Sequence, residues 1–182
     1  NATTNTIEQN PVPCRGLDWY QMLADNGAKD LNLMLVPQCA GCNESALNAT
    51  VESTLQQLQP AVDALTKAGL IEKAVVYGFD EMFSKYNASL RRIYGAVKER
   101  FPMLRTMATL DGNRGWTDMD PSLPVDIWVE TYNAYWNVIG PEARGQQVAK
   151  WRAAGKEYWW YWCLGPRQPD MLNTFVERPA TD

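Results

Sequence analysis

Two kinds of apolar pattern alternate along the chain. Short apolar runs are typical of buried strands, whereas apolar residues that recur every three or four positions are typical of amphipathic helices. The short runs predict strands at 31–36, 73–79, 104–110, 125–131 and 156–164. The second pattern predicts helices at 17–26, 50–69, 84–101 and 141–154. Pro60 lies within the second helix, where it can kink the helix or begin a new one, and the small polar segment 39–48 is expected to be a loop.

This alternation of strands and helices indicates an α/β protein. Strands joined through helices favour a parallel sheet with crossover connections. A closed barrel of eight such units typically needs about 250 residues, and the chain has 182. The pattern therefore leaves two architectures open, an open α/β sheet or part of a larger barrel. Residues 1–16 are polar and contain Pro11 and Pro13, which predicts an N-terminal arm or loop.

The rest of the chain is expected to be organised around the stretch 75–81, Val-Val-Tyr-Gly-Phe-Asp-Glu. Val75 and Val76 favour a buried strand because branched side chains fit a pleated surface, and Gly78 permits close approach of another group. Asp80 and Glu81 follow where the strand opens into a loop. In barrels of alternating strands and helices, these C-terminal strand ends carry the chemistry. The alternative is a purely structural role, since acidic side chains also stabilise the start of a following helix.

Composition is that of a folded soluble domain, with 46% hydrophobic and 21% charged residues. The eight Trp and eight Tyr suit either a large core or a sugar-binding cleft. A net charge of −4 without a basic cluster argues against a nucleic-acid partner. The longest apolar run, 33–37, is too short to span a membrane.

The chain contains no His, which removes the usual general base of a Ser-His-Asp hydrolase and any His-ligated metal site. Carboxylate-bound calcium stays open, but no metal site is predicted. The close pair Cys39 and Cys42 allows a redox motif, although such a motif normally precedes a helix. No second close pair supports a zinc site.

Asn and Cys residues indicate a secreted or lumenal protein. Sequons of the form N-x-S/T begin at Asn1, Asn43, Asn48 and Asn87, whereas the Asn, Ser and Thr content predicts about one by chance. The candidates for structural disulfides are Cys14, Cys39, Cys42 and Cys163. Four cysteines allow three pairings, and the sequence does not choose among them.

Three segments resemble the catalytic domain of glycoside hydrolase family 123 and its relatives among domains of unknown function. They are Val-Tyr-Gly-Phe-Asp-Glu at 76–81, Val-Asp-Ile-Trp-Val at 125–129 and Gly-Lys-Glu-Tyr-Trp-Trp-Tyr-Trp-Cys at 155–163. Gly-Pro-Arg at 165–167 and Asn-Thr-Phe at 173–175 follow the third segment. The resemblance extends from Val75 to the end of the chain, and the family's first and last strands are not recognisable. It implies an α/β fold that is part of a (β/α)8 TIM-like barrel, with 17–182 as one barrel-type domain and a fragment of a longer polypeptide.

The resemblance also implies hydrolysis of β-linked N-acetylgalactosaminides with retention of configuration. The family uses the acetamido group of the substrate as the nucleophile, so no cofactor is expected. Most retaining enzymes place two facing carboxylates roughly 5–5.5 Å apart, and substrate-assisted families are exceptions. Neighbouring acids suit the exception because they can act in sequence from one side. Glu81 is then the acid that protonates the leaving oxygen and later activates water. Asp80 holds the acetamido nitrogen.

Aromatic side chains are expected to form the sugar platform. The candidates are Tyr77, Trp128, Tyr132, Trp160 and Tyr161. Because side chains alternate along a strand, only one of the sets 158/160/162 and 159/161/163 can face the cleft. A Trp in a central strand is more often a core residue than a ligand contact, which is the alternative for each Trp.

Two functions follow from the sequence. The first is a secreted glycosidase, and the second is a catalytically inactive glycosidase-like domain that serves in glycan binding or extracellular assembly. The intact Asp80–Glu81 pair favours the first, and the short length and the nearby Asn87 sequon favour the second. The expected partner is an N-acetylhexosamine-containing glycan, together with other extracellular chains or the rest of a longer polypeptide. No nucleic acid and no membrane span are expected.

Overall fold

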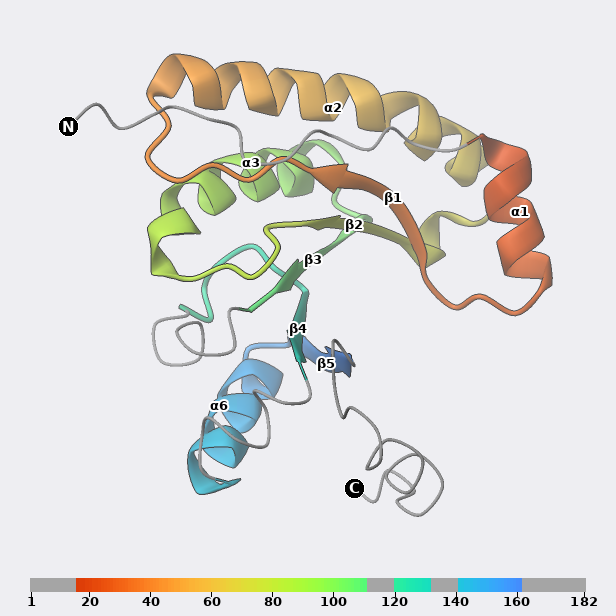
Figure 1. Cartoon of the computed structure of the whole chain (residues 1–182). Coiled ribbons are helices and arrows are strands. Elements are labelled where there is room, and N and C mark those ends of the chain that lie inside the picture. Colours follow the sequence, from red (N-terminus) through yellow and green to blue (C-terminus); the bar gives the residue numbers. More distant parts are fainter. Residues whose placement is uncertain (1–15, 111–119, 132–140, 162–182) are drawn as a thin grey trace, which may run out of the picture.

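Five parallel strands lie side by side in the order in which they occur along the chain (Figure 1). The computed structural model describes residues 16–110, 120–131 and 141–161. The strands are β1 (Leu31–Val36), β2 (Ala74–Gly78), β3 (Arg105–Thr109), β4 (Ile127–Thr131) and β5 (Glu157–Tyr161). The helices are α1 (Leu17–Asp25), α2 (Glu44–Lys67), α3 (Asn87–Arg100) and α6 (Pro141–Ala153), with short 3-10 helices η1 (Ile71–Lys73) and η2 (Ser84–Tyr86). The protein is therefore a mixed α/β protein, as its hydrophobic pattern predicts.

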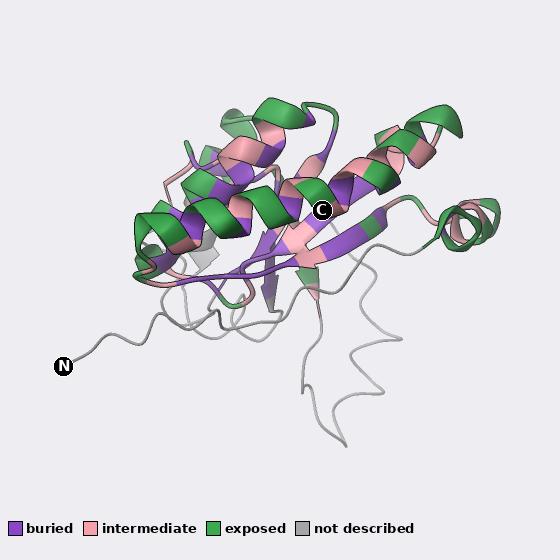
Figure 2. Ribbon diagram, turned by 90° about the horizontal axis from the view of Figure 1, so that it is seen from above, coloured by how far each residue is buried: buried purple, intermediate pink, exposed green. Residues whose placement is uncertain are grey.

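The helices that connect the strands cover one face of the sheet. Register places Val76, Thr106 and Ala108 in neighbouring positions on the same face, because Val76 pairs with Thr106 and side chains alternate along each strand. Val76 and Ala108 share one hydrophobic cluster with Leu58 of α2 and Ile93 of α3. Figure 2 shows the exposed residues of α2 on its outer side and the buried strands beneath it. Right-handed crossovers between strands in sequential order produce this one-sided arrangement.

The far end of the covered face is closed by a stack of aromatic rings. Trp151 of α6 lies between Trp128 of β4 and Tyr158 of β5, with ring centroids 5.7 Å and 5.5 Å apart. Both Trp side chains are fully buried. Aromatic rings bury large apolar areas and favour such offset contacts, so the stack fixes α6 against β4 and β5.

The opposite face carries a second apolar cluster to which none of the described helices contributes. It consists of Val75, Met107, Ile127, Val129, Trp159 and Tyr161. Val75 is 1% exposed and Ile127 is 0% exposed. Figure 1 shows the strand direction turning steadily from β1 to β4. Val75 of β2 shares this cluster with Ile127 and Val129 of β4, and Trp159 and Tyr161 of β5 pack against it. Burial across several strands without a described helix is the packing that a sheet curved toward this face produces.

Polar contacts tie the strands together at their N-terminal edge. Arg105 of β3 forms ion pairs with Asp30, just before β1, and with Glu157 at the start of β5. Asp126 accepts hydrogen bonds from the Thr106 backbone at 2.8 Å and from Lys98 at 2.7 Å. These contacts span from β1 to β5, so this edge is held by a continuous polar network.

The predicted strands and most of the predicted helices are confirmed, but the predicted start of α2 is wrong. The helix begins at Glu44 rather than Thr50, because the Asn43 side chain accepts a hydrogen bond from the Ala46 backbone at 2.9 Å and caps it. Much of the segment expected to be a loop is therefore helical. Pro60 lies inside one uninterrupted helix, so it does not begin a second one.

Gly78 provides a test of the packing between β1, β2 and α3. A Cβ atom at this position would lie 2.8 Å from the Cβ and from the carbonyl oxygen of Val36, and 3.1 Å from the Tyr94 hydroxyl. We expect Gly78→Ala to lower the free energy of unfolding by about 1–3 kcal/mol, because overpacking forces backbone shifts. Urea unfolding would measure this decrease in the free energy of unfolding.

The control for this variant is Gly95→Ala in α3. A Cβ atom there would meet no heavy atom within 4 Å, so the substitution should stabilise the helix by roughly 0.5–1 kcal/mol. Equal effects of the two substitutions would contradict the close approach at Gly78.

Candidate functional site

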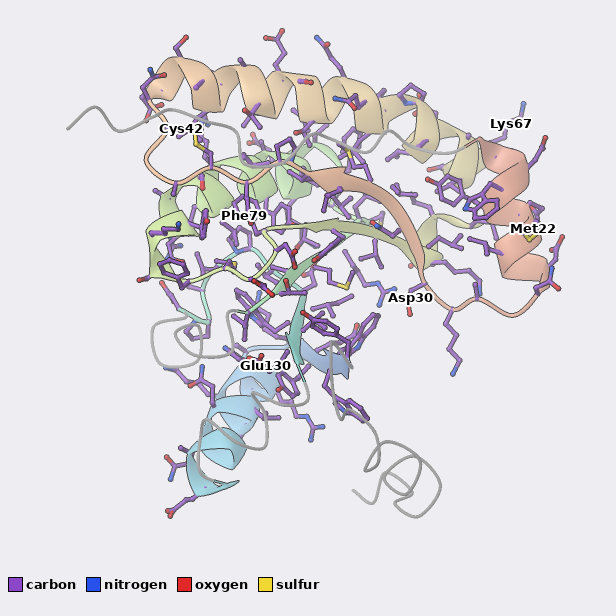
Figure 3. All side chains as sticks on the ribbon, viewed as in Figure 1. Met22, Asp30, Cys42, Lys67, Phe79 and Glu130 are labelled. Atoms are coloured by element: carbon purple, nitrogen blue, oxygen red, sulfur yellow. A yellow bond between two sulfur atoms is a disulfide. The ribbon has the colours of Figure 1, made fainter. Side chains whose placement is uncertain are left out.

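The turn that follows β2 carries the two candidate acids in an unusual backbone conformation. Phe79 and Glu81 have φ values of 57° and 48°. This left-handed region costs residues other than glycine about 1–2 kcal/mol each. The fully buried Phe79 ring packs edge-on against Tyr94, with centroids 5.1 Å apart, and Figure 3 shows Phe79 beneath α3. Such strain persists only where the surroundings hold it, which is common at ligand sites.

Asp80 is held by two hydroxyl groups from neighbouring strands. Its Oδ1 atom accepts a hydrogen bond from the Tyr77 hydroxyl at 2.6 Å and another from Thr109 Oγ1 at 2.6 Å. Hydrogen bonds to an ionised carboxylate are short and strong. Within residues 16–110, 120–131 and 141–161, no hydrogen bond uses the other oxygen, Oδ2. One oxygen of the carboxylate is therefore held, and the other has no partner among the described residues.

Glu81 is held through its backbone rather than its side chain. Its N–H donates to Thr109 Oγ1 at 2.8 Å, and the next residue, Met82, donates its N–H to the Thr109 carbonyl at 2.9 Å. The Glu81 side chain is exposed. Within the part of the chain that the structure describes, its carboxylate takes part in no hydrogen bond or ion pair. The turn thus fixes the backbone of Glu81, whereas nothing in the described residues fixes its carboxylate.

Tyr77 reaches this turn from the face of the sheet opposite the described helices. Burial is the largest cause that raises the pKa of its hydroxyl far above the ordinary value, and the hydrogen bond to Asp80 is the next. Tyr161 adds a smaller increase, whereas the hydrogen bond with Thr109 acts in the opposite direction. Tyr77 therefore remains a neutral hydrogen-bond donor at ordinary pH. It lies in contact with Asp80, one of the two predicted catalytic residues.

The predicted aromatic platform divides between the two faces. Tyr161 and Trp159 belong to the cluster on the same face as Val75, and alternation along β2 places Tyr77 there as well. Trp160 is 47% exposed but alternates to the other face. Of the two alternating sets on β5, the one that contains Tyr161 therefore faces the same side as Tyr77.

Trp128 departs from the expectation for a platform residue. It is 0% exposed and stacks on Trp151 on the face covered by helices. Enclosed in this way, it serves the core rather than a ligand, because no surface of the ring is accessible. Glu130, labelled in Figure 3, is also fully buried and shares this face by alternation. It is not part of the Tyr77–Asp80–Thr109 group.

Thr109 was not predicted from the sequence, although it contacts both acids. It is the last residue of β3, and β3 pairs with β2. The available signal was a hydroxyl residue at the C-terminal end of a predicted strand. Its relevance depends on which strand lies beside β2, and the pattern of apolar residues does not give that order directly.

The cysteine pair closest in sequence forms a disulfide. Cys39 and Cys42 are bonded to each other, just after β1 and before α2. Closing so short a loop contributes about 2 kcal/mol in the chain-entropy description. Figure 3 shows Cys42 at the same end of the sheet as Phe79, with Asp30 at the opposite end. The disulfide therefore lies at the edge of the sheet that carries Asp80.

Three of the predicted glycan acceptors lie in the described residues, near the same edge. Asn43 and Asn48 are exposed, and Asn48 accepts a hydrogen bond from Arg92 at 2.9 Å. Asn87 is partly buried at the start of α3. The remaining predictions, Asn1, Cys14, Tyr132 and Cys163, lie outside the described residues.

Among the described residues, no group of three or more His, Cys, Asp or Glu side chains could hold a metal ion. Among the helices that the structure describes, none is long and apolar enough to cross a membrane. Comparison with known proteins finds no matching family model and no matching curated sequence.

The raised pKa of Tyr77 predicts how stability depends on alkaline pH. The unfolded chain loses the proton near pH 10, the ordinary value, while the folded protein keeps it to higher pH. The free energy of unfolding should therefore fall between about pH 10 and about pH 12. We expect Tyr77→Phe to make this fall shallower. The pH slopes of the free energy of unfolding of the wild type and the variant should differ by less than about 1.4 kcal/mol per pH unit. The effect is below this limit because the Tyr77 side chain is partly exposed and solvent screens it.

Urea unfolding at several pH values would measure this difference. Tyr94→Phe is the matched comparison, since burial also raises the pKa of Tyr94 well above its ordinary value. A Tyr77→Phe variant that loses stability as steeply as the wild type would contradict the assignment.

Proposed function

We propose that this chain is the catalytic part of a secreted glycoside hydrolase that cleaves β-linked N-acetylhexosaminides with retention of configuration. The observation that carries the proposal is the turn after β2. It holds Asp80 between two hydroxyl donors and places Glu81 beside it, with a carboxylate that has no partner in the described residues. The resemblance to glycoside hydrolase family 123 supplies the substrate class, and N-acetylgalactosaminides are its most specific form.

A (β/α)8 barrel is the architecture that best accounts for the described sheet. Strands in strictly sequential order place every crossover on one face, whereas doubly wound sheets reverse their order and carry helices on both faces. The uncovered face here is apolar and the sheet curves toward it. Closing the curve into a barrel buries such a face without helices. The proposed site then lies at the C-terminal ends of the strands, where barrel enzymes act.

Two neighbouring acids suit a substrate-assisted reaction. In the first step the acetamido oxygen attacks C1, the glycosidic bond breaks, and Glu81 gives its proton to the leaving oxygen. Asp80 Oδ2 holds the acetamido N–H and stabilises the positive charge of the ring that forms. In the second step Glu81 removes a proton from water, which attacks C1 and restores the acetamido group. Asp80 and Glu81 act from the same side of the turn in both steps, so two acids adjacent in sequence are well placed for this reaction.

At the C-terminal strand ends, the face opposite the described helices offers a surface for the sugar ring. Trp159 and Tyr161 at the end of β5 lie on the same side as Tyr77. Flat aromatic faces bind the apolar face of a pyranose, and a hydroxyl group at the ring edge adds a polar contact. We assign the platform to Tyr77 and Tyr161, with Trp159 beside them. Trp128 and Trp160 are excluded from it because they alternate to the other face.

Secretion is supported by two kinds of residue. The Cys39–Cys42 disulfide is of a kind that persists in oxidising compartments. The exposed Asn43 and Asn48 begin sequons, and the Asn43 cap uses Oδ1, while a glycan attaches through the amide nitrogen. Glycosylation at Asn43 is therefore compatible with the start of α2.

A glycan-binding or assembly domain without catalysis is the second candidate. It is favoured by the exposure of Glu81, because a catalytic acid is normally enclosed by the groups that keep its proton in place. In that case Asp80 and the aromatic side chains hold a sugar without cleaving it.

Release of an aryl alcohol from an aryl β-N-acetylgalactosaminide tests the first candidate. Glu81→Gln removes the proton donor, and Asp80→Asn removes the charge that stabilises the ring intermediate. Each should lower turnover by about 10²–10⁴-fold. A more acidic leaving group needs less protonation, so it should narrow the deficit of Glu81→Gln more than that of Asp80→Asn.

Glu52→Gln is the matched control, because Glu52 is an exposed acid on α2 far along the chain from the turn. It should leave turnover unchanged. Wild-type turnover by either site variant would overturn the catalytic assignment. An inactive wild type that still binds the glycan would favour the second candidate.

A further inference from the structure

We propose that Thr109 is the positioning residue of this site, and that its hydroxyl sets the relative geometry of the two acids. The inference rests on the proposed function and adds a residue to it. The Thr109 hydroxyl donates to Asp80 Oδ1 at 2.6 Å and accepts from the Glu81 N–H at 2.8 Å. It therefore makes one contact with the side chain of one acid and one with the backbone of the other.

The bonding capacity of the hydroxyl group fits this double role. A threonine hydroxyl has one proton to donate and two lone pairs. The proton goes to Asp80, and one lone pair receives the Glu81 N–H. The Tyr77 oxygen lies 3.4 Å away, but its own proton is directed to Asp80 at the shorter distance of 2.6 Å. Thr109 thus has the donor and the acceptor that the turn needs.

The strained backbone makes this support necessary. Glu81 adopts a left-handed conformation that an isolated chain rarely populates. Its N–H would lose its hydrogen-bond partner if the Thr109 hydroxyl were removed. The carboxylate of Asp80 would keep only Tyr77 as a donor. Removing one hydroxyl therefore loosens both acids at the same time.

The fold itself does not depend on that hydroxyl. The Thr109 carbonyl independently accepts the Met82 N–H, and Met82 pairs with Leu110 as an isolated bridge. These backbone contacts tie the turn to β3 whatever the side chain is. A substitution at position 109 should keep the turn near β3 but no longer fix the orientation of the turn.

Threonine is suited to this position because its branched side chain is stiff. Two heavy atoms on Cβ restrict the rotamers of the side chain, so the oxygen stays in place between the acids. Valine keeps the branched shape and loses the hydroxyl. Serine keeps the hydroxyl and loses the methyl group. The two substitutions therefore separate hydrogen bonding from packing.

The test compares Thr109→Val and Thr109→Ser in the whole chain, with an aryl β-N-acetylgalactosaminide as substrate. We expect Thr109→Val to lower kcat by about 10²-fold, because small misplacements of catalytic groups have effects of this size. The change in KM should be small, since the contacts of both acids strengthen in the transition state. Thr109→Ser should restore most of kcat.

Thr106→Val is the matched control on the same strand. Thr106 is buried, and its hydroxyl donates to the Pro124 carbonyl at 2.7 Å, at the opposite edge of the sheet. Its loss should reduce stability without lowering kcat. An equal loss of kcat in Thr106→Val and Thr109→Val would overturn the inference, because the effect would then reflect general destabilisation.

A second measurement follows the free protein by NMR. The Glu81 amide proton should shift upfield in Thr109→Val and stay near its wild-type position in Thr109→Ser. An unshifted amide proton, or a normal kcat in an active Thr109→Val variant, would overturn the positioning role and leave the proposed function standing. Absence of turnover by the wild type would overturn the proposed function, and the positioning role with it.

Discussion

The right-handed crossover between parallel strands is the constraint on which the rest of the structure depends. Because the strands follow one another in sequential order, the described crossovers place α2, α3 and α6 on the same face. Every C-terminal strand end then lies at one edge, which brings Asp80 of the β2 turn next to Thr109 of β3. None of the described helices lies on the second face. An apolar face of this kind is buried only if the sheet curves over it, as the cluster around Val75 and Ile127 indicates.

The two edges of the sheet are built from different interactions. At the N-terminal edge, charged groups satisfy one another, with Arg105 paired to Asp30 and Glu157 and with Asp126 bonded to Lys98. At the C-terminal edge, two hydroxyl groups hold the Asp80 carboxylate, which no cation in the described residues neutralises. A charge held by neutral donors keeps its attraction for a ligand, whereas a paired charge does not. This contrast separates the proposed site at the C-terminal edge from the structural network at the N-terminal edge.

Most of the elements could be predicted from the sequence because their apolar residues follow the spacing of a strand or a helix. The start of α2 could not, since Leu47 is the only large apolar residue in 44–49 and the decisive signal was the Asn43 cap. The role of Trp128 depended on which face of β4 meets α6, and alternation alone gives two equivalent choices. Asp80 and Glu81 could be identified as candidates from their position after a strand. Thr109 could not, because its relevance comes from strand order, which is a property of tertiary structure.

The difference in how the two acids are held matches the difference in what each is proposed to do. Asp80 is proposed to act on one atom, the acetamido nitrogen, so a fixed carboxylate with one free oxygen is suitable. Glu81 is proposed to meet a leaving oxygen first and a water molecule later, which occupy different positions. A side chain with no partner in the described residues and with a fixed backbone can reach both. Rigidity in the turn and freedom in the Glu81 side chain are therefore complementary. The rigidity depends on Thr109, which bonds to the side chain of one acid and to the backbone of the other, and the freedom follows from the exposure of Glu81.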